Sequence, residues 1–152
     1  MEIANICILG AGNLGSRIGL QAALSGFIVT VYDINPKSLD SSLITMNKVI
    51  KYLIKSQEIT ASEGLEAIQR ITFTPDPKAA VANADLISES VTEDLEIKKS
   101  VWKQFGELAP TKTIFTTNTS YLLPSMLAED SGRPKQFCAF HFHDVFHSRV
   151  VD

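Results

Sequence analysis

The sequence predicts an α/β fold in which helices cover both faces of a mainly parallel β-sheet. Short runs rich in β-branched and aromatic residues alternate along the chain with segments whose apolar residues recur at helical spacing. The glycine-rich string GAGNLG, residues 10–15, lies between the first such run and the first helical segment. An aspartate, Asp33, ends the second run. Strands that alternate with helices are joined by right-handed crossovers, which produce a parallel, doubly wound sheet.

Six short runs are predicted strands, because they are rich in β-branched and aromatic residues and are bounded by turn-forming residues. In chain order they cover residues 3–9, 27–33, 71–75, 85–91, 113–117 and 136–142. No Gly/Ser-rich or Pro-rich linker separates one part of the chain from another. We therefore expect residues 1–152 to form one domain.

Helices are predicted between these strands from the spacing of their apolar residues. They cover residues 14–25, 36–55, 61–69, roughly 76–83, 95–108 and a brief segment from residue 124. The second begins with Asn35 as N-cap and Pro36 at the first helical position, and the third with a capping box of Thr60 and Glu63. The second and third helices together form a helical insertion after the second strand.

Composition and charge exclude several classes of function. Of the 152 residues, 45% are hydrophobic and 20% are charged, and the net charge is −3. A negative net charge argues against nucleic-acid or anionic-membrane partners, and the apolar runs are too short to span a bilayer. The N-terminus has no basic region before its apolar run, so no signal peptide is expected. Cys7 and Cys138 lie in apolar segments without metal-ligand spacing, which predicts two buried thiols in a reducing cytoplasm.

The glycine loop predicts a dinucleotide site of the Rossmann type. Gly10 permits a tight turn, Gly12 lets the backbone approach a pyrophosphate, and Gly15 lets the helix pack closely on the strand. The helix that begins at Asn13 and Leu14 would attract the anion with its N-terminal amides. A glycine turn that binds nothing, and a site for FAD or another nucleotide, are the alternatives.

Asp33 indicates which dinucleotide is bound. It lies 18 residues after Gly15, at the end of the second strand, where a carboxylate can accept hydrogen bonds from the adenosine ribose hydroxyls. An acid at this place repels the 2′-phosphate of NADP. No arginine follows it, and Lys37 is the only nearby cation in the sequence. The pattern favours NAD as cofactor.

From residue 71 onward the sequence resembles a known family. The motifs VTED at 91–94, TNTS at 117–120 and HF at 141–142 are jointly specific. With the glycine loop and the helical insertion, they make the whole chain similar to the NAD-binding domain of 3-hydroxyacyl-CoA dehydrogenases. The diketoreductases, close variants that act on β-keto esters and diketones, are at least as similar. The resemblance implies NAD-dependent interconversion of a 3-hydroxyacyl-CoA, or a related β-hydroxy compound, and its 3-keto form.

The resemblance also implies roles for residues of the second half. His141 matches the family's catalytic histidine, a general base toward the 3-hydroxyl group. Ser120 matches the serine that hydrogen-bonds the substrate oxygen, and Asn118 lies in the same loop beside the cofactor. Without the family, this polar loop after a strand equally fits turn and cap chemistry.

Two charged residues fall where the family contacts its cofactor, Glu93 and Lys98. Both follow the fourth predicted strand, at the carboxyl edge of the sheet where such folds bind ligands. Judged by spacing alone, Lys98 beside Lys99 also fits a solvated helix face.

The last residues depart from the family pattern HFFNP. Asp144 stands where the family has the asparagine near the nicotinamide. If one residue is deleted relative to the family, Asp152 aligns with the glutamate that orients the catalytic histidine. His141, His143 and His147 also have the spacing of metal ligands, but no cysteine or acidic cluster converges with them in the sequence. We therefore expect no metal.

The family further implies a helical domain that closes over the acyl substrate and mediates a homodimer, and no part of this sequence corresponds to it. We expect a truncated chain, with a natural single-domain protein as the alternative. An NAD(H)-binding module without measurable catalysis is accordingly the second functional hypothesis.

Overall fold

A six-stranded, all-parallel sheet forms the centre of the computed structural model, which describes residues 2–142 and 146. The strands are β1 (Asn5–Leu9), β2 (Ile28–Tyr32), β3 (Ile71–Thr74), β4 (Leu86–Glu89), β5 (Ile114–Thr117) and β6 (Phe137–Ala139). Their order in the sheet is β3-β2-β1-β4-β5-β6. The direction of winding reverses between β1 and β4, which confirms the predicted doubly wound Rossmann-type sheet.

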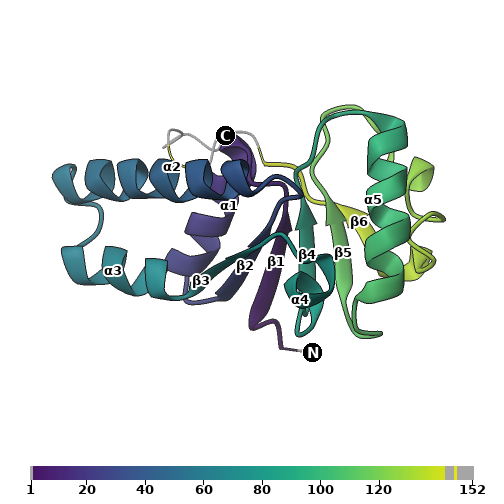
Figure 1. Ribbon diagram of the computed structural model, residues 1–152, viewed down its shortest axis with the longest axis horizontal. Helices are drawn as coiled ribbons and strands as arrows, with labels where there is room; N and C mark the ends of the chain where they lie inside the picture. Colours follow the sequence, from purple (N-terminus) through teal and green to yellow (C-terminus); the bar gives the residue numbers. More distant parts are fainter. Residues whose placement is uncertain (1, 143–145, 147–152) are drawn as a thin grey trace.

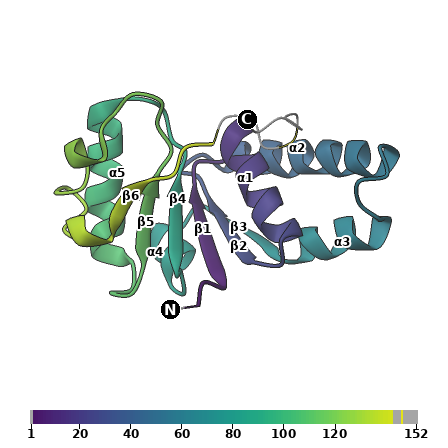
Figure 2. The same cartoon turned by 180° about the vertical axis from the view of Figure 1, so that it is seen from behind.

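Helices lie on both faces of this sheet (Figure 1). They are α1 (Asn13–Leu24), α2 (Pro36–Lys55), α3 (Ala61–Gln69), α4 (Pro77–Val81) and α5 (Leu95–Leu108), with two 3₁₀ turns, η1 (Pro124–Met126) and η2 (Pro134–Gln136). The predicted insertion is present as α2 and α3, which run side by side away from the sheet (Figures 1 and 2). None of the helices in the described part of the chain combines enough length with enough apolar character to cross a bilayer.

Two hydrophobic clusters hold the layers together, one on each face of the sheet. Side chains of a strand point alternately to the two faces, so Ile8 of β1 joins one cluster while Cys7 and Leu9 join the other. The cluster of Ile8 is completed by α1, α2 and α3, and that of Leu9 by α4 and α5. Trp102 of α5 is fully buried there.

The predicted helix starts are confirmed. The side chain of Asn35 accepts a hydrogen bond from the amide of Lys37 at 3.1 Å, and Pro36 is the first residue of α2. Thr60 and Glu63 form the reciprocal capping box of α3. Such caps satisfy amides that have no partner inside the helix.

The sixth strand differs from the prediction. It is shorter than 136–142, because residues 134–136 form η2 and the chain leaves the sheet after Phe140 donates its amide to the Thr117 carbonyl at 3.0 Å. Cys138 is exposed, so the expectation of two buried thiols is wrong for this residue. It lies on the outermost strand of the sheet. Cys7 is buried as expected, and burial raises the pKa of its thiol.

Candidate active site

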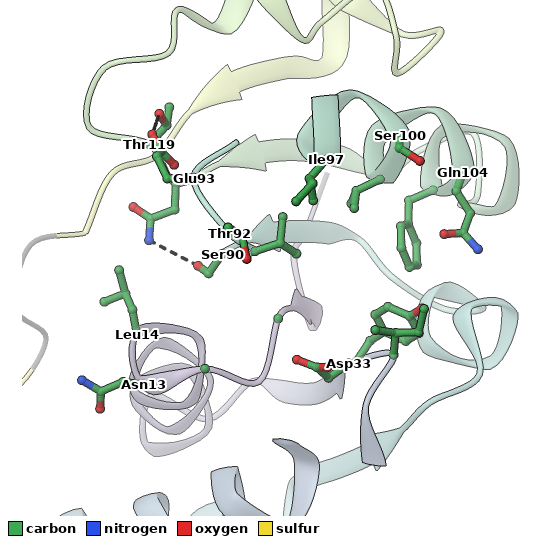
Figure 3. Close-up of a pocket in the computed structure, with 18 of the residues that line it drawn as sticks. Asn13, Leu14, Asp33, Ser90, Thr92, Glu93, Ile97, Ser100, Gln104 and Thr119 are labelled. Atoms are coloured by element: carbon green, nitrogen blue, oxygen red, sulfur yellow. Dashed lines mark hydrogen bonds between the residues drawn. The ribbon is translucent and has the colours of Figure 1, made fainter. Parts of the chain in front are cut away.

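A cleft of about 1000 Å³ lies at the carboxyl ends of the strands (Figure 3). Its wall includes most of the site residues predicted from the sequence: Gly10, Gly12, Asn13, Leu14, Asp33, Glu93, Asn118, Ser120 and His141. They come from the first turn of α1 and from the loops after β1, β2, β4, β5 and β6. The topology therefore brings together residues that are far apart in the sequence. Gly15 and Lys98 are not part of the wall.

Each of the three glycines in the loop is suited to its position for a different structural reason. Gly10 has φ +101°, and a Cβ added there would lie 2.7 Å from the carbonyl oxygen of Ser90. A Cβ on Gly15 would lie 2.0 Å from the carbonyl oxygen of Gly10, so glycine lets α1 pack against the loop. Apart from Gly12 itself and its two chain neighbours, no atom of the described residues lies within 4 Å of the Cβ position of Gly12, which faces the cleft. The loop therefore has room for a pyrophosphate at Gly12.

Asp33 is held at the glycine loop by backbone amides. Its Oδ2 accepts from the amide of Ala11 and its Oδ1 from the amide of Asn35, both at 2.9 Å. An ionised carboxylate offers about four acceptor sites, so both oxygens retain capacity for ribose hydroxyls. The structure thus fits the adenosine end of a dinucleotide at Asp33.

An apolar wall beside Asp33 was not predicted. It consists of Tyr32, the last residue of β2, and of Ile97, Val101 and Phe105 along α5. The rings of Tyr32 and Phe105 meet edge to face with centroids 5.1 Å apart, and burial, followed by the nearby Asp33 carboxylate, raises the pKa of the Tyr32 hydroxyl. The four-residue spacing along α5 is visible in the sequence, but it is equally typical of a core-facing helix.

Polar residues of α5 complete this end of the cleft. Ser100 and Gln104 line the cleft together with Ile97, and Figure 3 shows these residues spread along α5 on the side of the cleft across from Asp33. An apolar wall with a few polar groups is the usual environment of a bound nucleotide base.

Ser120 and His141 meet at the other end of the cleft. Ser120 Oγ lies 3.3 Å from Nε2 of His141, within hydrogen-bonding reach, and both residues are exposed. Ser120 belongs to the loop after β5 and His141 to the segment after β6, two strands that pair in parallel. A hydroxyl and an imidazole in this arrangement can act on the same substrate oxygen.

Asn118 fastens the segment that carries His141. Its Oδ1 accepts the amide of Phe142 at 3.0 Å, and its Nδ2 donates to Ser90 Oγ at 3.2 Å, the contact dashed in Figure 3. The Asn118 side chain thereby links the segments that follow β4, β5 and β6 at the site.

Glu93 supports the loop from the side of β4. Its Oε1 accepts from the hydroxyl of Thr119 and, at 3.3 Å, from the amide of Ser120. Burial alone would raise the pKa of the Glu93 carboxyl, but the Thr119 hydroxyl, the Lys98 ammonium and the Ser120 amide together hold it below its ordinary value. Glu93 therefore lines the cleft as a carboxylate.

Lys98 lies behind the loop. Its side chain is 0% exposed, so the alternative of a solvated helix face is wrong. Its Nζ is 2.6 Å from Oε1 of Glu89, an equally buried residue of β4 that sequence reasoning missed. The one available signal was an acid at the end of the predicted strand that contains LISE, because buried acids are rare unless they are paired.

Several predicted residues lie outside the described part of the chain. These are Asp144, Asp152, His143 and His147. The nicotinamide contact of Asp144 and the pairing of Asp152 with His141 stay predictions. Within residues 2–142 and 146, no group of three or more histidine, cysteine or acidic side chains is placed to hold a metal ion.

The fold and the cleft define a dinucleotide-binding domain of the Rossmann class. A family model described as the 3-hydroxyacyl-CoA dehydrogenase NAD binding domain matches residues 5–147. The chain belongs to this family, as the resemblance predicted, and its cofactor is NAD.

Curated relatives carry the same family description. A probable 3-hydroxybutyryl-CoA dehydrogenase of Bacillus subtilis (strain 168) is 32% identical over 142 residues, which cover 93% of this chain and 49% of that protein. A probable 3-hydroxyacyl-CoA dehydrogenase of Caenorhabditis elegans is 33% identical over 145 residues, with coverage of 93% and 49%. The chain thus spans about half the length of these relatives.

Solved structures of two related enzymes superpose closely. A diketoreductase, described as catalysing reactions of dicarbonyl compounds, has a TM-score of 0.88 and 40% identity, with 94% of this chain and 51% of that chain covered. The 3-hydroxybutyryl-CoA dehydrogenase of Escherichia coli K12 has a TM-score of 0.90 and 28% identity, with coverage of 95% and 30%. The predicted likeness to diketoreductases is confirmed.

Proposed function

We propose that this chain is the cofactor-binding part of an NAD-dependent oxidoreductase that interconverts a 3-hydroxyacyl-CoA, or a related β-hydroxy compound, and its 3-keto form. The observation that carries the proposal is the 3.3 Å approach of Ser120 Oγ and His141 Nε2, at the end of the cleft opposite Asp33. A proton-transferring pair at one end and a ribose-binding carboxylate at the other match the two ends of a dinucleotide.

The cofactor would be held by the residues predicted from the sequence. We assign contacts to Gly10, Gly12, Asn13, Leu14, Asp33, Glu93, Asn118, Ser120 and Asp144. Gly15 and Lys98, which lie outside the cleft wall, would shape the site from behind. The open side of Gly12 and the fixed carboxylate of Asp33 support this assignment. NAD, when bound, supplies the nicotinamide that accepts or returns the hydride.

His141 and Ser120 perform the proton chemistry. In oxidation, His141 Nε2 takes the proton of the substrate's 3-hydroxyl, and in reduction it returns this proton to the same oxygen. Ser120 Oγ donates a hydrogen bond to that oxygen and fixes its position. Asp152 is proposed to orient the imidazole and to stabilise its charged form.

A β-dicarbonyl compound is the second candidate substrate. The diketoreductase is 40% identical to this chain, against 28–33% for the relatives named for acyl-CoA substrates that are described above. We further propose an enzyme of fatty acid metabolism that is homodimeric at full length, because the family resemblance implies both. We propose a cytoplasmic location because the two cysteines are free thiols, which is typical of a reducing compartment. An NAD(H)-binding module without catalysis is the alternative.

Two measurements separate these functions. Titration of the chain with NADH, followed by fluorescence, should show saturable binding, and its absence would contradict both the enzyme and the binding module. NADH oxidation is then followed with acetoacetyl-CoA and with a simple 1,3-diketone. Turnover supports the enzyme and identifies its substrate class, whereas binding without turnover supports the module.

A further inference from the structure

A cluster of three charged residues lies beneath the loop that carries Ser120. It consists of Glu89 at the end of β4, Glu93 and Lys98, and we call it the charge cluster. Glu89 and Lys98 are each 0% exposed, with 2.6 Å between Nζ and Oε1, and Glu93 is 30% exposed. A buried ion pair adds little net stability, because removing both ions from water is costly. Such a pair therefore points to a role other than holding the fold together.

The ammonium of Lys98 is fully engaged within the protein. Its Nζ lies 2.6 Å from Glu89 Oε1, 3.2 Å from the carbonyl oxygen of Asn118 and 3.3 Å from Glu93 Oε2. An ammonium group has three N–H donors, so these three oxygens match its full capacity. Direct donation to a cofactor would require one of these contacts to break.

Glu89 connects two neighbouring loops. Its Oε1 also accepts the amide of Val91, at 2.8 Å, and its Oε2 accepts the hydroxyl of Thr117, at 2.6 Å. The loop after β4 and the last residue of β5 are thus bonded to a single carboxylate.

Every residue of the loop 117–120 touches the charge cluster. Thr117 does so by its hydroxyl, Asn118 by its carbonyl, Thr119 by its hydroxyl and Ser120 by its amide. Four consecutive residues are therefore fixed by three charged side chains. The position of Ser120 Oγ relative to His141 depends on these bonds.

We propose that Glu89 and Lys98 are positioning residues, which fix the loop 117–120 so that Ser120 and His141 meet at the cleft. Lys98 supports the loop from behind the cleft wall, through Glu93 and the carbonyl of Asn118. The catalytic meaning of this placement rests on the proposed function, but the fixing of the loop is a property of the chain alone.

The test compares three variants of the full chain. Glu89→Leu/Lys98→Met removes both fully buried ions together and replaces them with apolar side chains of similar volume. Lys98→Met removes the ammonium alone. Lys99→Met, the neighbouring and partly exposed lysine, is the matched control.

For each variant we measure the amide order parameters of residues 118–120, the unfolding temperature and the Kd for NADH. We expect the double variant to fold but to unfold at a lower temperature than the unchanged chain, because the Val91 amide, the Thr117 hydroxyl and the Asn118 carbonyl lose a buried partner. Its order parameters at 118–120 should fall from about 0.85 to below about 0.6. NADH should also bind more weakly, because Asn118 and Ser120, which the proposed function assigns to the cofactor, then lose their fixed positions. If the protein turns over substrate, kcat should fall at least about tenfold.

Two results would overturn the proposal. One is an ordered loop in a folded double variant, which would mean that other contacts position Ser120. The other is a loss of NADH affinity of about tenfold or more in Lys98→Met with the loop still ordered, which would mean that Lys98 contacts the cofactor directly. Loop order and NADH affinity are both measured without turnover. The positioning role can therefore be disproved while the enzymatic function stands, and the enzymatic function can be disproved while the positioning role stands.

Discussion

At the scale of single residues, Asp33 is fixed before any cofactor binds. Its two oxygens each accept one backbone amide at 2.9 Å, one from the glycine loop and one from the residue before α2. The carboxylate therefore needs no rearrangement to meet the ribose hydroxyls. Pre-organised groups of this kind lose little conformational entropy on binding.

Asp33→Asn tests this role. An amide nitrogen must replace one oxygen and would face a backbone N–H, so we expect NADH to bind at least about tenfold more weakly. NADPH should lose less affinity, because the charge that repels a 2′-phosphate is gone. Titration with both cofactors gives the comparison, with Asp40→Asn, an exposed carboxylate of α2, as control. Equal losses for both cofactors would contradict a role in selecting NAD.

Residue identities at the site could be predicted from the sequence, but their partners could not. Ser120 and His141 lie at the ends of neighbouring strands, and the parallel topology alone brings them to one edge. For Lys98 and Lys99, adjacent on one helix, spacing could not tell which one is buried. Which lysine is buried depends on Glu89, nine residues before Lys98. Its partner is defined only by the packing of α5 on the sheet.

At the scale of elements, the glycine loop sets how closely α1 approaches β1. Gly12→Ala and Gly15→Ala separate packing from cofactor binding. Gly15→Ala should lower the free energy of unfolding by about 1–3 kcal/mol, because its Cβ would lie 2.0 Å from a backbone oxygen. Gly12→Ala should keep the stability and weaken NADH binding, because its Cβ would enter the cleft. Urea unfolding and NADH titration measure both effects, and equal stabilities of the two variants would contradict this division.

Asp85 ties three strands together at the opposite edge of the sheet. Its carboxylate accepts the amides of Ala4 and Asn5, at 3.0 and 2.8 Å, and pairs with Lys112, which precedes β5. The Lys112 ammonium and the amides of Asn5 and Ala4 hold the pKa of the Asp85 carboxyl well below its usual range. The stabilisation is therefore present above the unfolded-state pKa of about 3.9 and is lost as the pH falls through the lower folded-state pKa.

Asp85→Ala should lower the free energy of unfolding at neutral pH by roughly 2–4 kcal/mol, because two strand amides lose their acceptor. Below about pH 4 the difference from the unchanged chain should shrink, since the carboxyl group progressively loses its charge. Urea unfolding at a series of pH values measures this, with Asp40→Ala as control. A difference that stays constant down to about pH 2 would contradict the electrostatic origin.

Most elements could be predicted to within one or two residues, because hydrophobic period and capping residues are local signals. The end of β6 could not be predicted from the sequence. The amide of Phe142 bonds the side chain of Asn118 instead of a strand carbonyl, and that competition is set by tertiary structure. The prediction that Cys138 is buried was wrong for a related reason, since an apolar segment can form an outermost strand whose face stays exposed.

At the scale of the whole molecule, the reversal of strand order assembles the site. The glycine loop and Asp33 come from the β1–β2 side, and the loops of Glu93, Ser120 and His141 come from the β4–β6 side (Figures 1 and 3). The cleft between the two sides is where such sheets bind ligands. A ligand that spans it contacts both halves and should stabilise the fold as a unit.

NADH should accordingly raise the unfolding temperature. At a concentration of about 100 times Kd, binding to the folded state adds about 2.7 kcal/mol, or roughly 5–11 °C for a domain of this size. NADPH at the same concentration should have a smaller effect, because Asp33 disfavours it. A thermal shift assay gives both values, and equal shifts for the two cofactors would contradict the assignment of NAD.

The central claim is that Ser120 and His141 act together on one substrate oxygen. A double-mutant cycle of Ser120→Ala and His141→Gln, measured as kcat/KM with NADH and the accepted keto substrate, tests it most directly. We predict that His141→Gln lowers kcat/KM by roughly 10²–10⁴-fold. We also predict that the double variant loses less than the product of the two single losses, because the residues form one unit. Independent, multiplicative losses, or unchanged kcat/KM in His141→Gln, would contradict the claim.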